Sequence, residues 1–420
     1  MNLSGSLSLG GTSFNSFIHT TSRGSAPAAA LNITAHDILL TDSSTLSTET
    51  FRSGPGGALN IFAQNLQLTN GGQVRSGSTM EVLIPGEPPV IPTGAGGTIT
   101  IQGLASPAAS VEIDGAGSGI FTNTQGTGAG GSINLAAQSV TVQNGGTISA
   151  ASSGTAPSAT GGDITISASQ FVKLNNGASL TASSTGPGNA GNIFIDAGQN
   201  YTSTNSSVTT EAVQASGGKI TVMASDMVRM TNSKISTSVA DGTGGGGNIT
   251  IDPNFVILQN GQILAQAFAG AGGNITITTG TFLPDANSLV NASSQFGLSG
   301  TVAIQSPTSN LSAVWARLQQ NYAEAAALLR ARCAAQVSGT QSSFVLAGRD
   351  TLPLEPGGWL PSPLALEGMA VGLPIAQELT APALTLADVR VRGLDHDFSW
   401  LGSGKTPRRF LSILDSACGS

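Results

Sequence analysis

Residues 246–251 read Gly-Gly-Asn-Ile-Thr-Ile, and this hexapeptide recurs along most of the chain. Close copies begin at 96, 161 and 272, looser copies begin at 56, 130, 190, 217 and 299, and degenerate copies begin at 4 and 28. The second positions of successive copies are 24 to 40 residues apart. A repeat of this length predicts an array of similar structural units, such as a solenoid or a propeller.

Each copy opens a unit of three short apolar runs. Ile249 and Ile251 alternate with Thr250, which places the isoleucines on one face of a strand and the threonine on the other. A second alternating run at 256–258 precedes Asn-Gly at 260–261, a pair that tolerates positive φ and marks a tight turn. A third apolar run and a loop rich in Ser, Gly and Ala complete the unit.

Three strands within about 27–30 residues fit one turn of a three-sided parallel β-helix. A propeller blade would require about 40 residues and four antiparallel strands. We therefore predict an all-β fold, a right-handed β-solenoid of about 11 coils over residues 1–304. The hand is taken from the rule for parallel β-crossovers. Stacked coils would bury their Ile, Leu and Val columns in one continuous core.

The paired glycines that open each unit are interpreted as conformational. Glycine permits a sharp corner without a clash at Cβ. The alternative is a loop that cradles a ligand, and residues 244–247 superficially resemble a phosphate-binding loop. No Lys-Ser/Thr pair follows this segment, and no helix is expected there, so the conformational interpretation is preferred.

A proline-rich insertion at 80–92 falls within the longest units. Proline cannot donate a hydrogen bond to a strand ladder, so we expect a loop extruded from one corner of the coil. Such loops often carry recognition in solenoids. The alternative is an insertion that the fold merely tolerates.

The composition limits the class of protein. Glycine accounts for 56 of 420 residues, only 9% of residues are charged and 5% are aromatic, and no apolar run is long enough to span a membrane as a helix. Residues 1–304 contain 7 Lys/Arg and 14 Asp/Glu, whereas residues 305–420 contain 9 of each. Because no basic stripe is present, we expect no nucleic-acid partner.

The period of the sequence changes after Ile304. Apolar residues spaced by three and four over 311–333 predict an amphipathic helix. We assign residues 305–338 to this helix and expect it to cap the open end of the β-helix, with Trp315 and Tyr322 making capping contacts rather than a binding site. Residues 339–420 are rich in proline, which predicts an extended, partly irregular tail.

Three segments carry a family resemblance: Leu-Leu-Arg-Ala-Arg-Cys-Ala-Ala at 328–335, Ser-Ser-Phe-Val-Leu-Ala-Gly-Arg at 342–349 and Leu-Pro-Leu-Glu-Pro at 352–356. Together they resemble the C-terminal signature of filamentous-haemagglutinin-like exoproteins, which belong to two-partner secretion systems of Gram-negative bacteria. The coil motif resembles the β-helical stem of the same family. Asp350 and Thr351 replace two glycines of the family pattern, and the family's N-terminal secretion domain, with its Asn-Pro-Asn motif, is missing from the sequence.

The resemblance implies a non-enzymatic adhesin-like protein, either secreted or held at the outer membrane on the cell surface. It implies an outer-membrane transporter as a partner, and attachment to host or cell-surface glycans or proteins. The chain enters a degenerate repeat at once, without a signal peptide. We therefore expect the C-terminal part of a longer or truncated protein.

Cys333 and Cys418 are the only cysteines. An even number of cysteines in an exported chain favours a disulfide between them. Two unpaired thiols are the alternative.

An enzyme is the alternative function, because parallel β-helices also host polysaccharide lyases and hydrolases. Such chemistry requires paired carboxylates on one face. Asp196 and Asp252 occupy equivalent positions two coils apart, but the coil between them has Met223 there. We therefore interpret both as solvated turn carboxylates and expect no catalytic residue.

Other candidates are equally weak. Of the three histidines, His19, His36 and His396, only the last has a possible metal-binding context, Asp-His-Asp at 395–397, and no partner cluster accompanies it. We expect no metal and no cofactor.

Outward threonines recur at Thr100, Thr165, Thr221, Thr250 and Thr276. A column of this kind, like that of ice-binding solenoids, is one interpretation of the repeat. Asn134 and Phe194 interrupt the column, so strand propensity explains it better.

Overall fold

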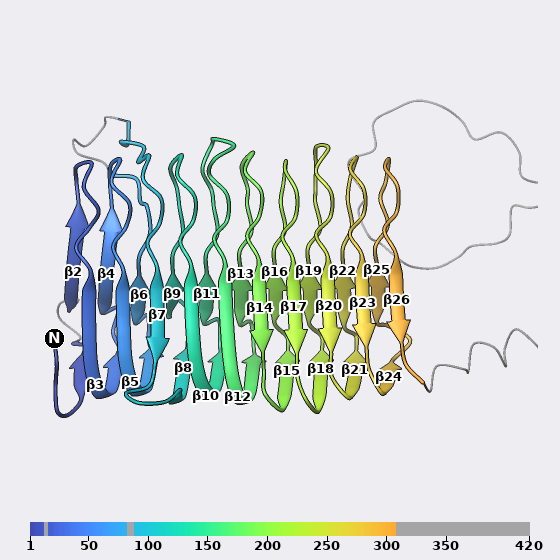
Figure 1. The fold of residues 1–420 in the computed structure, drawn as a ribbon, viewed down its shortest axis with the longest axis horizontal. Helices are drawn as coiled ribbons and strands as arrows, with labels where there is room; N and C mark the ends of the chain where they lie inside the picture. Colours follow the sequence, from blue (N-terminus) through green and yellow to red (C-terminus); the bar gives the residue numbers. More distant parts are fainter. Residues whose placement is uncertain (12–15, 82–87, 308–420) are drawn as a thin grey trace, which may run out of the picture. The chain divides into compact units, whose positions relative to one another are not determined.

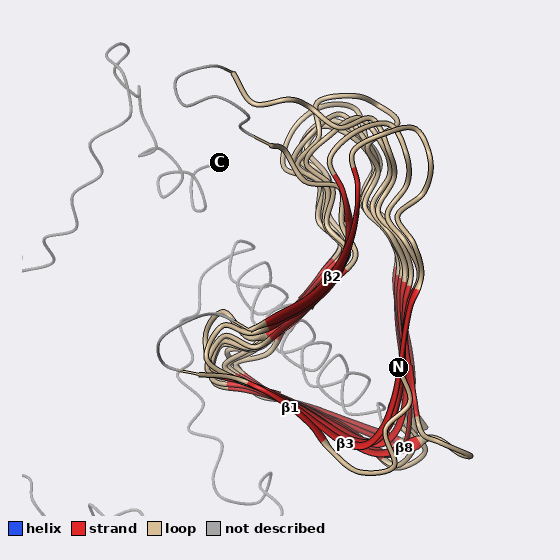
Figure 2. Cartoon of the chain, turned by 90° about the vertical axis from the view of Figure 1, so that its left-hand side faces the viewer, coloured by secondary structure: helices blue, strands red, loops and turns tan. Residues whose placement is uncertain are grey.

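The structure is a computed structural model, and it describes residues 1–11, 16–81 and 88–307. The predicted capping helix from residue 308 onward, the proline-rich tail, both cysteines and the 395–397 segment lie outside these residues. The described part is a stack of coils with a three-sided cross-section (Figures 1 and 2). Its named strands all pair in parallel with a strand of a neighbouring coil, and the described residues contain no helix. The predicted parallel β-solenoid is therefore confirmed.

The first two faces share one 16-stranded sheet. Strands of the first face alone are β7 (Ile99–Gln102), β14 (Ile193–Asp196), β17 (Ile220–Met223), β20 (Ile249–Asp252), β23 (Ile275–Thr278) and β26 (Val302–Gln305). Strands of the second face alone are β1 (Leu7–Leu9), β8 (Ala108–Asp114), β15 (Asn200–Thr204), β18 (Met227–Thr231), β21 (Phe255–Gln259) and β24 (Thr281–Pro284). Four longer strands pass through both faces: β3 (Leu31–Leu40), β5 (Leu59–Thr69), β10 (Ile133–Gln143) and β12 (Ile164–Asn175).

The third face is a separate sheet of ten short strands, one from each turn, so the coils make about ten turns and not the 11 predicted. In order along the axis they are β2 (Phe17–Ser22), β4 (Thr45–Thr50), β6 (Gln73–Arg75), β9 (Gly119–Phe121), β11 (Thr147–Ser149), β13 (Ser179–Thr181), β16 (Ser207–Thr209), β19 (Lys234–Ser236), β22 (Gln262–Leu264) and β25 (Leu289–Asn291).

The register of the first coil differs from the prediction. The segment 4–9 was expected to be a degenerate copy of the first strand, but Leu7–Leu9 pairs with Ile38–Leu40 on the second face. The first face begins instead at Asn2, which forms a parallel bridge with Thr34. Alternating apolar and polar residues fit either face equally well, so hydrogen bonding to the next coil decides the register.

The core follows the predicted alternation. Ile249 and Ile251 are completely buried, whereas Thr250 between them is partly exposed. Equivalent residues in the other coils continue these apolar columns into one buried cluster along the stack. Since no single coil could bury its own apolar face, each coil depends on its neighbours for stability.

The corner between the second and third faces is built by asparagines with positive φ. Asn70, Asn144, Asn176 and Asn260 have φ of 47°, 53°, 48° and 51°, and each precedes a glycine as predicted. Asparagines at 205 and 232 adopt the same conformation without a following glycine. Their side chains form ladder bonds between coils, such as Asn260 Nδ2 donating to the Oδ1 of residue 232 at 3.0 Å.

The paired glycines lie where the chain returns to the first face, and here backbones of successive coils stack closely. A Cβ added at Gly247 would overlap the carbonyl oxygen of Gly218, and one added at Gly218 would overlap that of Gly191. The buried Thr237 hydroxyl donates to the Gly247 carbonyl at 2.5 Å. This packing supports a conformational role for the glycine pair.

The proline-rich insertion leaves the stack at Glu81. Glu81 and Val90 form an antiparallel bridge, in which the Val90 amide donates to the Glu81 carbonyl at 2.8 Å. Residues 82–87 lie outside the described part of the chain. The root of the insertion therefore pairs with itself and not with the parallel ladder of the third face.

Candidate functional site

The third face is the candidate functional surface. Figure 2 shows that its strands lie between two groups of loops, one at the asparagine corner and a larger one that leads back to the first face. Three surface hollows, of about 430, 360 and 260 Å³, all lie along this face or its edges. A recessed face that runs along the stack could accommodate an extended ligand that contacts several coils.

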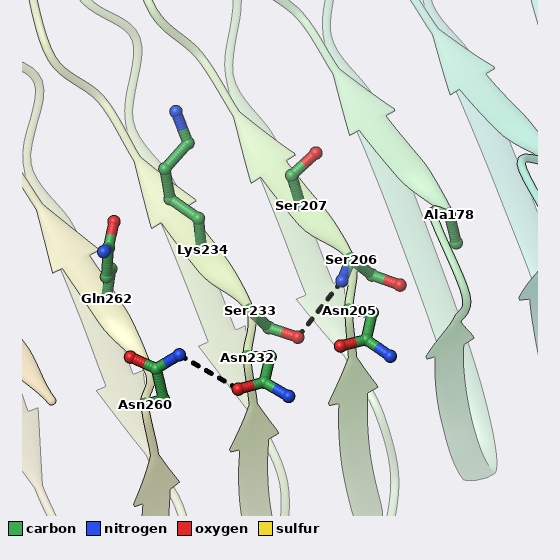
Figure 3. Close-up of a pocket in the computed structure, with 10 residues that line it drawn as sticks. Ala178, Asn205, Ser206, Ser207, Asn232, Ser233, Lys234, Asn260 and Gln262 are labelled. Carbon is green, nitrogen blue, oxygen red and sulfur yellow. Dashed lines mark hydrogen bonds between the residues drawn. The ribbon is translucent and has the colours of Figure 1, made fainter. Parts of the chain in front are cut away.

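The largest hollow lies at the asparagine corner of coils that contain β13, β16, β19 and β22 (Figure 3). Ser207, Lys234 and Gln262 stand in register on adjacent strands. The Ser206 amide donates to the Ser233 hydroxyl at 3.2 Å, which links two coils behind them. The lining is thus a row of hydroxyl, amide and ammonium groups repeated at the strand spacing, about 4.8 Å.

One ion pair crosses the third face here. Lys234 Nζ lies 2.8 Å from Glu211 Oε1, and both side chains are 37% exposed. Glu211 also lines the 260 Å³ hollow at the opposite edge of the face. The pair therefore joins the two hollows, and because both side chains are exposed to solvent it contributes little to stability.

Hydroxyl groups connect the coils between these hollows. Thr209 Oγ1 donates to Thr181 Oγ1 at 3.2 Å, and Ser183 Oγ donates to Thr209 Oγ1 at 3.3 Å. Further along, Ser149 Oγ donates to Asn123 Oδ1 at 2.6 Å. Such groups can both donate and accept hydrogen bonds, which suits a ligand rich in hydroxyls.

The 360 Å³ hollow at the N-terminal end has a different lining. It combines the aromatic rings of Phe17, His19 and Phe51 with Arg23 and Glu49. Of these five residues, the sequence pattern singles out only His19, without a role, and it gives no indication of the other four. The available signal was that third-strand positions here carry aromatic and charged residues where β11, β13 and β16 carry Ser and Thr.

The carboxylates considered for catalysis are in register, as predicted. Asp196 pairs with Met223, and Met223 pairs with Asp252. Both aspartates are exposed at the end of first-face strands, and Asp196 accepts a hydrogen bond from the Gly198 amide at 3.1 Å. Two strand spacings separate them by roughly 9–10 Å, with an apolar side chain between. They lie outside the three hollows, whose linings do not include them.

The structure also gives the positions of the predicted threonine column and of His36. The threonine column is in register, with Thr165, Phe194, Thr221, Thr250 and Thr276 on adjacent first-face strands. His36 Nδ1 lies 3.1 Å from Asp37 Oδ2 on the surface. Among the described residues, no group of three or more His, Cys, Asp or Glu side chains is arranged to hold a metal ion.

Comparison with known proteins adds no relative: no protein-family model, no curated protein and no solved structure matches this chain. Within the described ranges, no helix has the length and apolar character needed to cross a membrane. The surface chemistry of the stack is therefore the feature that indicates a function.

Proposed function

We propose that this chain is the β-helical stem of an adhesin-like exoprotein, secreted or displayed at the outer membrane. The observation that carries the proposal is the third face, which repeats hydroxyl and amide groups coil after coil and is lined by hollows along its length. Repetition of a weak contact along one ligand raises the overall affinity by multivalency. A right-handed winding, as parallel crossovers favour, belongs to the same proposal.

Membership of the filamentous-haemagglutinin-like exoproteins, with export by an outer-membrane two-partner transporter, is a further part of this proposal. Its support is the sequence resemblance at 328–356 together with the parallel stack. The genomic sequence upstream of codon 1 tests it. An in-frame signal peptide and secretion domain would support export, and an unrelated gene ending there would overturn it.

We propose that residues 305–338 cap the stack, and the support for this role is the exposed apolar surface of the last coils. Leu283, Leu289, Phe296, Leu298 and Val302 are 43–82% exposed there, an apolar surface that a cover would shield from water. Deletion of residues 308–420 should make the shortened chain self-associate in analytical ultracentrifugation. A shortened chain that stays monomeric at high concentration would argue against a cap.

A disulfide between Cys333 and Cys418 would tie the tail to this cap.

Attachment is tested directly with the purified full chain coupled to fluorescent beads. We expect these beads to adhere to glycan- or protein-coated surfaces and to host cells more than beads coupled to albumin. Equal adherence of the two kinds of bead would overturn the attachment function.

A carbohydrate-active enzyme is the second candidate, favoured only by the alignment of Asp196 with Asp252. Their separation is close to the upper limit for an inverting carboxylate pair, about 9.5 Å. Release of reducing ends or unsaturated products from soluble polysaccharides would favour this candidate, provided that Asp196→Asn abolishes it. The stem function predicts no turnover.

A further inference from the structure

The N-terminal end of the third face concentrates arginines, which are scarce elsewhere in the coils. Residues 1–304 contain only four arginines, and three of them, Arg23, Arg52 and Arg75, lie on the first three coils. We call this surface the aromatic–arginine patch, and define it by the residues Phe17, His19, Arg23, Glu49, Phe51 and Arg75.

The charged groups of the patch are fixed by ion pairs between coils. Arg23 Nε and Nη2 each lie 2.8 Å from Glu81 Oε1. Arg75 Nε lies 2.9 Å from Glu49 Oε1. Both carboxylate side chains are only 14% exposed, and the hydrogen bond from Arg23 lowers the pKa of Glu81. The guanidinium groups are therefore held in place before any ligand arrives, which reduces the entropy lost on binding.

The aromatic rings are both exposed and oriented. Phe17 is 62% exposed, and its ring lies 5.0 Å from the His19 ring, tilted by 45°. The Arg23 guanidinium lies 5.1 Å from the centre of the Phe51 ring, a cation–π arrangement that holds this ring on the same surface. Thr21, Thr45 and Ser47 add hydroxyl groups to the hollow between the rings.

This combination matches one class of ligand. A pyranose ring presents an apolar C–H face, which packs on an aromatic ring, and an edge of hydroxyls, which bond to planar side chains such as carboxylate and guanidinium. Arg23 and Arg52 share Glu81, and Arg75 pairs with Glu49. Three arginines against two carboxylates leave an excess of one positive charge, which selects only weakly for a polyanion. The concave lining and its few oriented polar groups are typical of a small-ligand site.

We propose that the aromatic–arginine patch binds a pyranose unit of a glycan. The proposal rests on the attachment function proposed above and assigns recognition to one end of the third face. The strand spacing of about 4.8 Å is close to the length of one pyranose in an extended chain. Further sugar units would therefore lie over Gln73 and Arg75 on β6 and Phe121 on β9, before they reach the hydroxyls that begin at β11.

The test uses the full chain on an array of defined neutral and acidic oligosaccharides, followed by titration calorimetry with the best-bound sugar. We expect Phe17→Ala to weaken binding at least tenfold and Glu49→Gln to weaken it several-fold. The matched control is Phe194→Ala, because Phe194 is also exposed, at 37%, but lies on the first face. Thermal unfolding followed by circular dichroism checks that each variant keeps its fold.

Three outcomes would overturn the proposal. If Phe17→Ala binds the sugar as tightly as the unaltered chain, the patch is not the site, although attachment by another surface stands. If no sugar on the array binds, the patch does not recognise glycans, and adherence of beads to protein-coated surfaces decides the attachment function separately. Equal weakening by Phe17→Ala and Phe194→Ala would likewise exclude a specific role for the patch.

Discussion

Where a coil has glycine at both the asparagine corner and the glycine-pair corner, the two glycines are needed for different reasons. At the asparagine corner, Gly177 has φ of +83°. A Cβ added to Gly177 would be 3.7 Å from the nearest atom, the backbone nitrogen of Gly145, so space is available there. At the glycine-pair corner, Gly247 needs no positive φ, but an added Cβ would overlap the carbonyl oxygen of Gly218. The first corner is limited by backbone conformation and the second by the space between coils.

The difference explains how much sequence variation each corner accepts. Asparagine tolerates the left-handed region, so the first corner uses Asn at 205 and 232 without a following glycine. No residue other than glycine avoids the overlap at the second corner, and the second glycine is kept in every coil from 57 to 300. Stacking distance, and not turn geometry, is therefore the stricter constraint on this fold.

Among substitutions at the two corners, the largest effect is expected from Gly247→Ala. The overlapping atom belongs to the backbone of the preceding coil, so relief requires the coils to separate. We expect a loss of about 3 kcal/mol or more, at or beyond the upper range for overpacked sites. Hydrogen exchange should show faster exchange in β17, β20 and β23, and unchanged exchange there would refute the stacking explanation.

Thr237→Val should have the next largest effect. It removes the hydroxyl that donates to the Gly247 carbonyl at 2.5 Å but keeps the shape of the side chain. A buried acceptor left without a partner costs about 1–3 kcal/mol. Chemical denaturation measures the loss, and Thr237→Ser, which retains the hydroxyl, is the control; similar losses in both variants would assign the effect to packing.

Gly177→Ala should be milder than Gly247→Ala, because space is available and only the positive φ is unfavourable. The left-handed conformation costs an alanine about 1–2 kcal/mol. Denaturation midpoints of the two variants provide the comparison. A loss at 177 as large as that at 247 would contradict the distinction between the corners.

The smallest effect is expected from Thr250→Ser, because Thr250 points outward between two buried isoleucines. Substitutions on such surfaces usually change stability by less than about 0.5 kcal/mol. Ile249→Asp, which buries a charge one residue away, should unfold the neighbouring coils. A large loss with Thr250→Ser would reverse the assignment of inside and outside.

Much of the fold follows from local sequence signals. The alternation at Ile249, Thr250 and Ile251 predicts the buried and exposed faces, and Asn-Gly at 176–177 predicts a turn with positive φ; both predictions are confirmed. The prediction that Asp196 and Asp252 occupy equivalent positions in their coils is confirmed, because both are in register with Met223 on the strand between them. These signals lie within a few residues of the structures they predict.

The surface could not be predicted in the same way. Arg75 meets Glu49 across 26 residues, and Arg23 meets Glu81 across 58. Loops of variable length separate these residues, so their contact depends on the register of whole coils. The first coil shows the same problem, since Leu7 fits either of two faces by pattern alone and only its pairing with Ile38 decides.

The direction of the strand ladder has a mechanical consequence. Hydrogen bonds such as that from the Ile249 amide to the Asn274 carbonyl, 2.9 Å long, join successive coils, so they run along the axis of the stack. A pull along this axis loads the coils in series, and the coil with the weakest contacts opens first. Each released coil of 26 residues, the interval from 247 to 273, would lengthen the tether by roughly 90 Å at about 3.4 Å per residue. A stem of this kind would yield under load in steps, and its remaining coils would stay folded while one gave way.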